Sequence, residues 1–359
     1  MWATLVGSSG AADEWPPEIA PLFEPPAEFA GKLGSYRSPL LFEDGTRVAS
    51  EEDWKRRRAE IRAKWESVMG SWPALIEKPA VEFLASTTRE GLAQHRVRVE
   101  IAPGQTLDGW LLVPPGKTKA PAVVVPFYDA ESGAGLAKPL VDFGYQLAKR
   151  GFVTLSIGSP GGDAWRPKIG GVQCQPLSGL GYVATNCANA LANLSEVDPA
   201  RIGVIGHSYG GKWAMFAACL SERFACGAWS DPGSVFDETR GNVNYWEPWY
   251  LGLDPAVTRK PGIPSETNPR TGAYKTMLDR GMDLHELHAL MAPRPFFVSG
   301  GSEDPPERWM ALNHSVAVNE LLGRSRRVGM SNRPGHQPTA ESNEQIYRFF
   351  EHTLKPGEK

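Results

Sequence analysis

Val204-Ile205-Gly206-His207-Ser208-Tyr209-Gly210-Gly211-Lys212 joins a short apolar run to an alanine-rich stretch with helical spacing. The glycines two positions before and after Ser208 permit a sharp backbone turn that larger residues resist. A strand, a turn and a helix in this order would lift the Ser208 hydroxyl above the end of a β-sheet. The first N–H groups of that helix would then point towards any anion formed beside the hydroxyl.

Strand-like and helix-like stretches alternate along most of the chain. Such alternation predicts an α/β fold, with a mostly parallel sheet between two layers of helices. The expected strands are 121–126, 152–157, 201–205, 224–229, 295–300 and 326–330. The expected helices are 136–149, 180–195, 209–222, 306–322 and 340–354. Three earlier stretches with alternating apolar residues predict an antiparallel meander over 81–87, 94–101 and 108–114.

The chain divides into two predicted parts. Residues 1–75 hold a Pro- and Gly-rich arm and an amphipathic helix that begins after Ser50, and we expect them to pack on the main domain. We expect residues 76–359 to form this main domain, which would be the catalytic one. A long insertion at about 231–283 is predicted to be a cap over the site, because loops of this length in compact domains are usually functional.

Composition narrows the possible partners. The 359 residues carry a formal net charge of −3 and 41% hydrophobic residues, which predicts a large core and no nucleic-acid partner. No apolar run approaches the ~20 residues that cross a bilayer, so we expect no membrane span. Residues 1–7 lack the basic and apolar regions of an intact signal peptide. The sequence does not indicate an oligomeric state.

The cysteines and glycines do not indicate a cofactor or a metal. The four cysteines lack metal-ligand spacing, and Cys174 and Cys187 could pair in an oxidising compartment or remain free thiols. No dinucleotide-binding glycine pattern or P-loop occurs. We therefore expect a reaction carried by side chains alone.

The elbow serine needs a base, and the base needs an orienting carboxylate. His336 lies in the loop after the last strand, which opens at the same sheet edge as Ser208 because parallel strands end there together. Asp304, after the preceding strand, is the predicted acid. Glu303 beside it and Asp231 after strand 224–229 are the alternatives.

An acyl-transfer site also needs donors for an oxyanion and a surface for the substrate. The backbone N–H of Tyr209 is one predicted donor, and Tyr128 in the loop after strand 121–126 is the other, although the usual His-Gly-Gly run is absent there. Aromatic residues in loops predict flat-faced ligand contacts. The candidates are Trp246, Trp249 and Tyr245 in the insertion and Trp165 in loop 158–179, for which packing is the alternative role.

Three motifs resemble a known family. The elbow at 206–212, the stretch 291–296 and the Gly-His loop at 335–336 look like the dienelactone-hydrolase and acetyl-xylan-esterase side of the α/β-hydrolase superfamily. Residues 240–246 are similar to a segment of bacterial carbohydrate-esterase-like proteins, and glucuronoyl esterases have a related Gly-x-Ser-x-x-Gly-Lys elbow. The resemblance spans roughly 80–355.

This resemblance implies a three-layer α/β-hydrolase sandwich with Ser208, Asp304 and His336 as a catalytic triad. Many members of the family are secreted, which implies a secreted or periplasmic location. The chain departs from glucuronoyl esterases at Tyr209, where those enzymes place an arginine that helps to hold the oxyanion.

Together these features predict a serine carboxylic-ester hydrolase that acts through an acyl-enzyme. Acetylated carbohydrate or a similar small ester is the expected substrate, since the loops carry many aromatic residues. Three alternatives are a peptidase or other acyl hydrolase on the same fold, a uronate-ester hydrolase of the glucuronoyl-esterase kind, and a non-catalytic binding protein.

Overall fold

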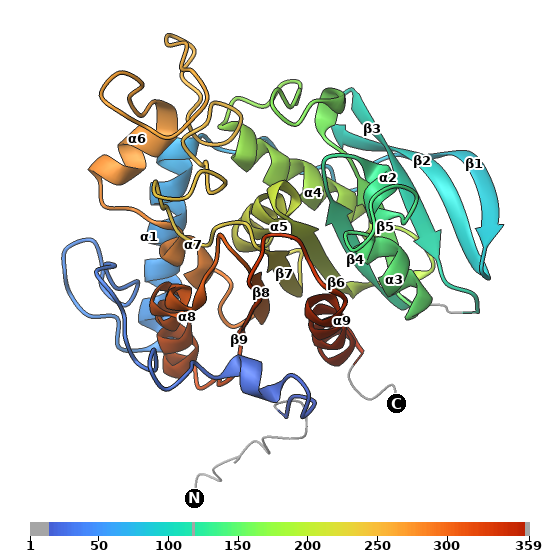
Figure 1. Cartoon of the computed structure of the whole chain (residues 1–359). Helices are drawn as coiled ribbons and strands as arrows, with labels where there is room; N and C mark the ends of the chain where they lie inside the picture. The colour runs from blue at the N-terminus through green and yellow to red at the C-terminus, as the bar shows by residue number, and fades with distance from the viewer. Residues whose placement is uncertain (1–13, 117–118, 356–359) are drawn as a thin grey trace, which may run out of the picture.

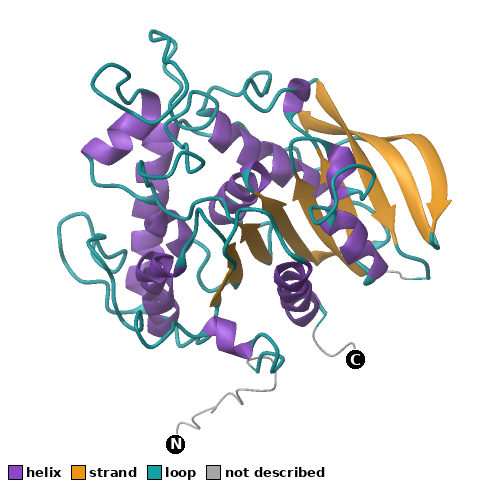
Figure 2. Ribbon diagram, viewed as in Figure 1, coloured by secondary structure: helices purple, strands orange, loops and turns teal. Residues whose placement is uncertain are grey.

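The computed structural model describes residues 14–116 and 119–355. The expectations for residues 1–7 lie outside this range. Within the described residues, nine strands form one sheet in the order β1-β2-β3-β5-β4-β6-β7-β8-β9, with helices on both faces (Figures 1 and 2). The predicted three-layer α/β architecture is confirmed.

The first strands form the predicted antiparallel meander. It consists of β1 (Val81–Arg89), β2 (Leu92–Ala102) and β3 (Gln105–Val113), and β3 then pairs antiparallel with β5. The remaining strands are parallel to one another: β4 (Ala120–Pro126), β5 (Val153–Ile157), β6 (Val197–His207), β7 (Cys226–Ser230), β8 (Phe296–Gly300) and β9 (Val328–Asn332). Every residue of β4, β5, β7 and β8 is buried, which explains their continuous apolar sequences.

Helices from distant parts of the chain cover the two faces of the sheet. On one face lie α3 (Phe143–Lys149), α9 (Ala340–Leu354) and the short α2 (Ala130–Gly133). On the other face lie α4 (Pro176–Ala192) and α5 (Tyr209–Leu220). Beyond α5, Figure 1 shows α1 (Glu51–Met69), α6 (Gly272–Asp279), α7 (Leu284–Ala289) and α8 (Trp309–Leu321) gathered at one side of the molecule. Single 3-10 turns occupy Ala20–Phe23, Pro160–Gly162 and Pro306–Arg308.

One predicted helix is shorter than expected. Residues 136–149 were expected to be a single helix, but within that range only α3, Phe143–Lys149, is helical, and α2 ends before the range begins. Gly135 and Leu140 have φ angles of 69° and 63°, in the left-handed region that ends a helix. Pro139 between them lacks the N–H that a continuous helix would use.

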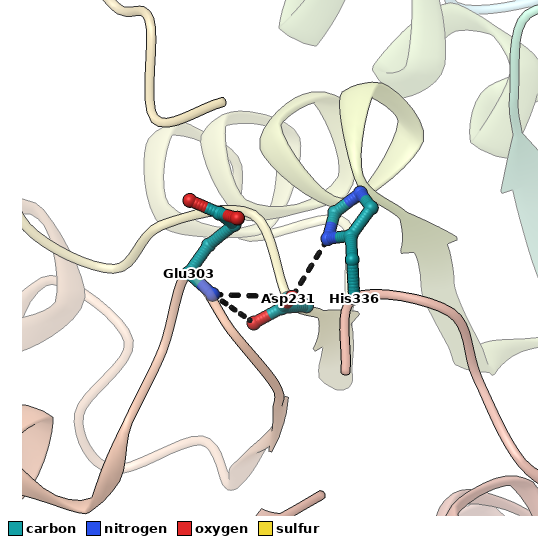
Figure 3. Close-up of side chains that lie close together, drawn as sticks. All are labelled: Asp231, Glu303 and His336. Atoms are coloured by element: carbon teal, nitrogen blue, oxygen red, sulfur yellow. Dashed lines mark hydrogen bonds and ion pairs between the residues drawn. The ribbon is translucent and has the colours of Figure 1, made fainter. Parts of the chain in front are cut away.

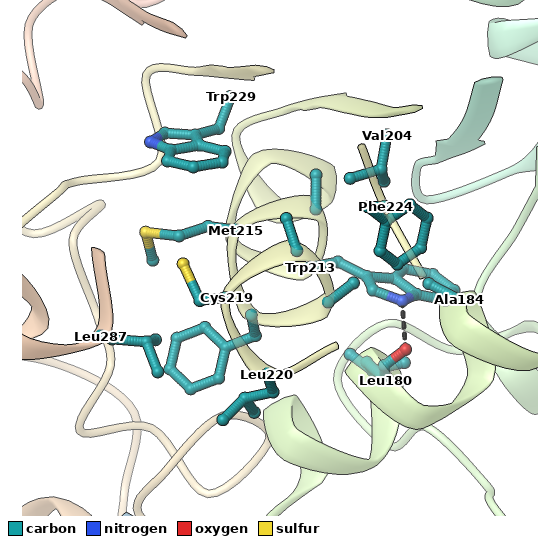
Figure 4. Close-up of a cluster of buried hydrophobic side chains, with 14 of the residues drawn as sticks. Leu180, Ala184, Val204, Trp213, Met215, Cys219, Leu220, Phe224, Trp229 and Leu287 are labelled. Carbon is teal, nitrogen blue, oxygen red and sulfur yellow. Dashed lines mark hydrogen bonds between the residues drawn. The ribbon is translucent and has the colours of Figure 1, made fainter. Parts of the chain in front are cut away.

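Helix α5 lies at the centre of the molecule and is buried along its whole length. All twelve of its residues are buried between the sheet and α4. The Trp213 indole donates a hydrogen bond to the carbonyl of Leu180 in α4, and both side chains are fully buried (Figure 4). Because α5 begins at the residue after Ser208, this packing fixes the position of the elbow.

The N-terminal segment is attached through buried polar groups. In α1, the guanidinium of the fully buried Arg57 lies 2.7 Å from Glu43 and 3.5 Å from Glu286 of α7. His285 Nε2 lies 2.7 Å from the Arg37 carbonyl, and His314 Nε2 lies 3.0 Å from the Leu33 carbonyl. The domain boundary at residues 75 and 76, and the role of 231–283 as a cap, stay predictions.

Two composition-based expectations can be compared with the structure. Among the described residues, no helix is both long and apolar enough to span a bilayer. Cys174 and Cys187, whose pairing was left open, are both free thiols, as are Cys219 and Cys226.

His285 and His314 bind main-chain carbonyls of the N-terminal arm, and their buried neutral rings predict a loss of stability in acid. Burial lowers the pKa of His285 from 6.5 to about 3, so the unfolded chain takes up a proton that the folded chain refuses as the pH falls below 6.5. This residue should contribute ~2 kcal/mol to the fall in unfolding free energy between pH 7 and pH 5. Urea denaturation at both pH values checks it. His285→Asn should lower stability at pH 7 yet show a smaller fall, and an unchanged fall would contradict the assignment.

Candidate active site

The elbow depends on two close backbone approaches. A Cβ atom at Gly206 would lie 2.1 Å from the Gly210 carbonyl oxygen, and one at Gly210 would lie 2.2 Å from the Pro126 carbonyl oxygen. Ser208 between them has φ 54° and ψ −115°, a conformation that side chains rarely adopt. Its N–H donates to the Ser230 carbonyl at 2.8 Å, which ties the turn to the end of β7. The predicted strand–turn–helix is therefore present, and the glycines are required by space.

Three strand ends bring a hydroxyl, an imidazole and a carboxylate together. Ser208 Oγ lies 2.8 Å from His336 Nε2, and His336 Nδ1 lies 2.7 Å from Asp231 Oδ2. Ser208 follows β6, Asp231 follows β7 and His336 follows β9, so all three lie at the carboxyl edge of the parallel strands. This is the arrangement in which a base can take the serine proton while a carboxylate orients the imidazole.

The carboxylate differs from the predicted one. Asp304 was expected beside His336, but Asp231, one of the two alternatives, occupies that position. The Asp304 carboxylate instead accepts the N–H groups of Gly233 at 2.8 Å and Ser234 at 2.5 Å. Asp304 is fully buried. Burial is the main cause that raises its pKa, and the negative charge of the nearby Asp231 raises it further. The Asp304 carboxylate therefore binds the main chain of the turn that follows Asp231 rather than the imidazole.

Backbone donors hold the Asp231 carboxylate. It accepts N–H groups from Gly301 at 2.6 Å, from Asp304 at 2.9 Å and from Glu303 at 3.1 Å. The side chain is fully buried, and these donors compensate for its lost hydration. A hydrogen-bonded carboxylate at this place fixes the orientation of the His336 ring.

Glu303, the other alternative acid, meets Asp231 through its main chain. Figure 3 shows its N–H directed at the Asp231 carboxylate while its own carboxylate points elsewhere. That carboxylate accepts the hydroxyl of Ser302 at 2.8 Å and the amide of Asn242 at 3.3 Å. Among the described residues, Asp231, Glu303 and His336 are the group whose ligand atoms, within 4.8 Å of one another, could hold a metal ion. Two of these atoms already pair with each other.

The two predicted oxyanion donors lie on either side of Ser208. Tyr209 is the first residue of α5, so its N–H belongs to the unsatisfied first turn of a helix. Its ring is buried, and its hydroxyl oxygen accepts the hydroxyl of Ser159 at 3.2 Å. Tyr128 follows β4, and its phenol lies near the Ser208 side chain, which acts to lower the pKa of Tyr128. Burial raises the pKa of Tyr128, so this phenol remains a hydrogen-bond donor at neutral pH.

The aromatic residues expected to contact substrate separate into two groups. Trp246 and Tyr245 are fully buried, and their polar atoms bond to Glu247 Oε1 at 3.1 Å and to the Gly233 carbonyl at 2.8 Å. They pack the core of the insertion, so the expectation of ligand contact is not met. Trp249 is half-buried, and Trp165 is 58% exposed with its ring centroid 6.1 Å from that of Tyr128.

Sequence reasoning missed Arg333, which binds the residue that carries the imidazole, whereas His207 and Lys212 were expected to have packing or tethering roles in the elbow. Arg333 Nη2 donates to the His336 carbonyl at 2.6 Å, and the His207 ring centroid lies 4.7 Å from that of His336. Lys212 Nζ donates to the Asn242 carbonyl at 3.1 Å, and burial lowers the pKa of Lys212 to about 8. A guanidinium that binds main-chain oxygens has no sequence signature, although the position of Arg333 just before the Gly-His pair was available as a hint.

Comparisons with known proteins match part of the chain by sequence. The family model described as "prolyl oligopeptidase family" matches residues 184–260, which include the elbow. A carbohydrate esterase from an unknown prokaryotic organism is 25% identical over 193 residues, which are 45% of this chain and 41% of that protein. The matched region thus spans less than half of the curated relative.

Solved structures match over almost the whole chain. A glucuronoyl esterase from Solibacter usitatus has a TM-score of 0.69 and 19% identity, covering 89% of this chain and 97% of that one. The chain has the α/β-hydrolase fold. A promiscuous CE15 esterase from the marine bacterial metagenome has a TM-score of 0.67 and 19% identity, with the same coverage of 89% and 97%. The fold expected from the elbow is therefore confirmed.

The pairing of His336 with Asp231 predicts unequal effects of two matched substitutions. Asp231→Asn should slow the reaction of Ser208 with a fluorophosphonate by about 10²- to 10⁴-fold, because an asparagine favours the wrong imidazole tautomer. Asp304→Asn removes a buried carboxylate of the same kind and should mainly lower thermal stability. Mass-spectrometric labelling rates check both. Slower labelling by Asp304→Asn than by Asp231→Asn would contradict the assignment.

Proposed function

We propose that this protein is a serine carboxylic-ester hydrolase that acts on carbohydrate esters through an acyl-enzyme. The observation that carries the proposal is the continuous chain of hydrogen bonds from Ser208 to His336 to Asp231, with distances of 2.8 Å and 2.7 Å. The carbohydrate esterase and glucuronoyl esterase likenesses support it.

In this proposal Ser208 Oγ attacks the ester carbonyl carbon while His336 Nε2 takes the hydroxyl proton. Asp231 accepts the Nδ1–H of His336 and stabilises the imidazolium that forms. The oxyanion of the tetrahedral intermediate receives the Tyr209 N–H and the Tyr128 hydroxyl. His336 then gives its proton to the departing alkoxide. Water, deprotonated by the same imidazole, cleaves the acyl-enzyme and restores Ser208.

The Tyr128 phenol has a particular place in this scheme. It lies near the Ser208 side chain, which acts to lower the pKa of Tyr128, so the phenol can reach the tetrahedral centre that forms on Ser208. Glucuronoyl esterases carry an arginine at the position of Tyr209, and here the Tyr209 ring is directed into the core. We infer that the phenol of Tyr128 takes the place of the missing guanidinium as a side-chain donor.

An acetylated carbohydrate is the preferred substrate class. The exposed Trp165 ring lies beside the ring of Tyr128, the predicted oxyanion donor, and exposed aromatic rings offer flat apolar faces to a sugar ring. A uronate ester is the second candidate, favoured by the extent of the match to the Solibacter usitatus glucuronoyl esterase. A peptidase remains the third, since the prolyl oligopeptidase family model matches the elbow region.

Hydrolysis assays on matched substrates test the proposal. Wild-type protein should hydrolyse p-nitrophenyl acetate and acetylated xylo-oligosaccharides faster than a peptide p-nitroanilide. Ser208→Ala should lower kcat by at least ~10³-fold because the nucleophile is lost. Equal rates for wild type and Ser208→Ala would refute the proposal. Faster cleavage of methyl glucuronate than of the acetyl esters would instead select the second candidate.

Removal of the Tyr128 hydroxyl tests the oxyanion assignment separately. Tyr128→Phe should lower kcat on p-nitrophenyl acetate by ~10²-fold with little change in KM, because one donor to the transition state is lost. Tyr182→Phe is the matched control. Tyr182 lies in α4, and its hydroxyl donates to the Ala74 carbonyl at 3.0 Å rather than to a residue of the site. If both variants keep the wild-type kcat, the phenol is not an oxyanion donor.

A further inference from the structure

Arg333 fastens the histidine loop to two strands of the sheet. The side chain is only 8% exposed and lies three residues before His336 in the loop after β9. Its Nη2 donates to the His336 carbonyl at 2.6 Å and to Ser230 Oγ at 3.1 Å. Its Nη1 donates to the Ser299 carbonyl at 2.8 Å, and Nε donates to the Gln337 carbonyl at 2.7 Å. One guanidinium therefore joins the ends of β7 and β8 to the residue that carries the imidazole.

The partner Ser230 also holds the nucleophile and a second histidine. Its carbonyl accepts the N–H of Ser208 at 2.8 Å, and its hydroxyl lies 3.1 Å from His207 Nδ1. Burial lowers the pKa of His207 well below 6.5, with smaller contributions from His336 and Arg333, so a neutral ring packs against the His336 ring. Arg333 and Ser208 thus both bond to Ser230. Arg333 donates to the Ser230 hydroxyl, and the Ser208 N–H donates to the Ser230 carbonyl.

Within the described part of the chain, the bonds of Arg333 are all to neutral oxygen atoms. Its positive charge is buried without a carboxylate among its hydrogen-bond partners, and burial lowers its pKa while Asp231 and Asp304 act to raise it. A buried cation of this kind is costly, and a merely structural link could be made by neutral groups. The charge lies near the carboxylate of Asp231, which acts to raise the pKa of Arg333.

The loop that carries His336 also passes close to the end of β8. Gly335 precedes the histidine, and a Cβ atom at Gly301 would lie 2.3 Å from the Gly335 carbonyl oxygen. The Arg333 N–H adds one bond, to the Gly300 carbonyl at 3.0 Å. A planar guanidinium with five donors can bind three segments at once, whereas a lysine ammonium acts as a single point.

We propose that Arg333 is a positioning residue: it fixes the main chain of His336 so that the imidazole stays between Ser208 and Asp231. The proposal rests on the function proposed above. Displacement of the imidazole by about 1 Å would cost ~10²-fold in rate, because the proton must pass along a short and direct hydrogen bond.

The test compares Arg333 with a matched arginine at the opposite end of the sheet. Arg294 donates to the carbonyls of Ser221 and Phe224, each at 2.8 Å, and burial lowers its pKa to about 10. Arg333→Met should lower kcat on p-nitrophenyl acetate by ~10²-fold with KM nearly unchanged, and Arg333→Lys should recover part of the loss. Arg294→Met should lose stability but keep the wild-type kcat. With Arg333→Ala, added guanidinium chloride at sub-denaturing concentration should restore part of the rate.

A second measurement does not depend on turnover. The proton shared by His336 Nδ1 and Asp231 should give a downfield ¹H NMR signal, assigned by its loss in His336→Gln. Arg333→Lys, the milder variant if Met prevents folding, should shift or broaden this signal, whereas Arg294→Met should leave it unchanged. An intact signal together with a rate equal to that of Arg294→Met would overturn the positioning role.

The two proposals fail in different ways. If Ser208→Ala matches wild type, the esterase proposal fails, and the NMR comparison still decides whether Arg333 positions the imidazole. If Ser208 is required but neither the rate nor the signal responds to Arg333, only the positioning role fails.

Discussion

The close approach of the main chain at Gly206, Gly210 and Pro126 is the constraint on which the site depends. With carbonyl oxygens 2.1 Å and 2.2 Å from the places where Cβ atoms would stand, neither glycine can be replaced without moving β4, β6 or α5. The backbone at Ser208 is held in its rare conformation because a fully buried helix begins immediately after it. The burial of α5 thus supplies the free energy that keeps the hydroxyl at the sheet edge.

The sequence predicted the positions of strands and site residues where the residue types and the order of the strands indicated the same place. Apolar runs located β4 to β9, and the elbow and His336 followed because parallel strands end at one edge. The acid could not be chosen in this way, since Asp231 and Asp304 follow adjacent strands of that same edge. The choice depends on backbone geometry: Asp231 has φ 51° and receives the N–H groups of Gly301, Glu303 and Asp304. Neither the angle nor the donors can be read from residue types.

The insertion illustrates a different limit. Its aromatic residues suggested a ligand surface, yet Trp246 and Tyr245 pack inwards and Lys212 lies against the Tyr245 and Tyr250 rings, 5.2 Å and 5.5 Å from their centroids. Aromatic residues serve equally well as core and as binding surface, so composition cannot tell which side they face. Trp165, which is exposed, lies in loop 158–179, and this loop has fewer aromatic residues than the insertion.

The free thiols bear on where such a fold can operate. Burial raises the pKa of Cys174 to about 11 and of Cys187 to about 12, and it raises those of Cys219 and Cys226 further. The thiolate is the form that reacts with oxidants and that attacks disulfides, and at neutral pH these four groups hold their protons. Disulfide bonds among these four cysteines therefore play no part in holding the fold together, and burial makes the thiols slow to react.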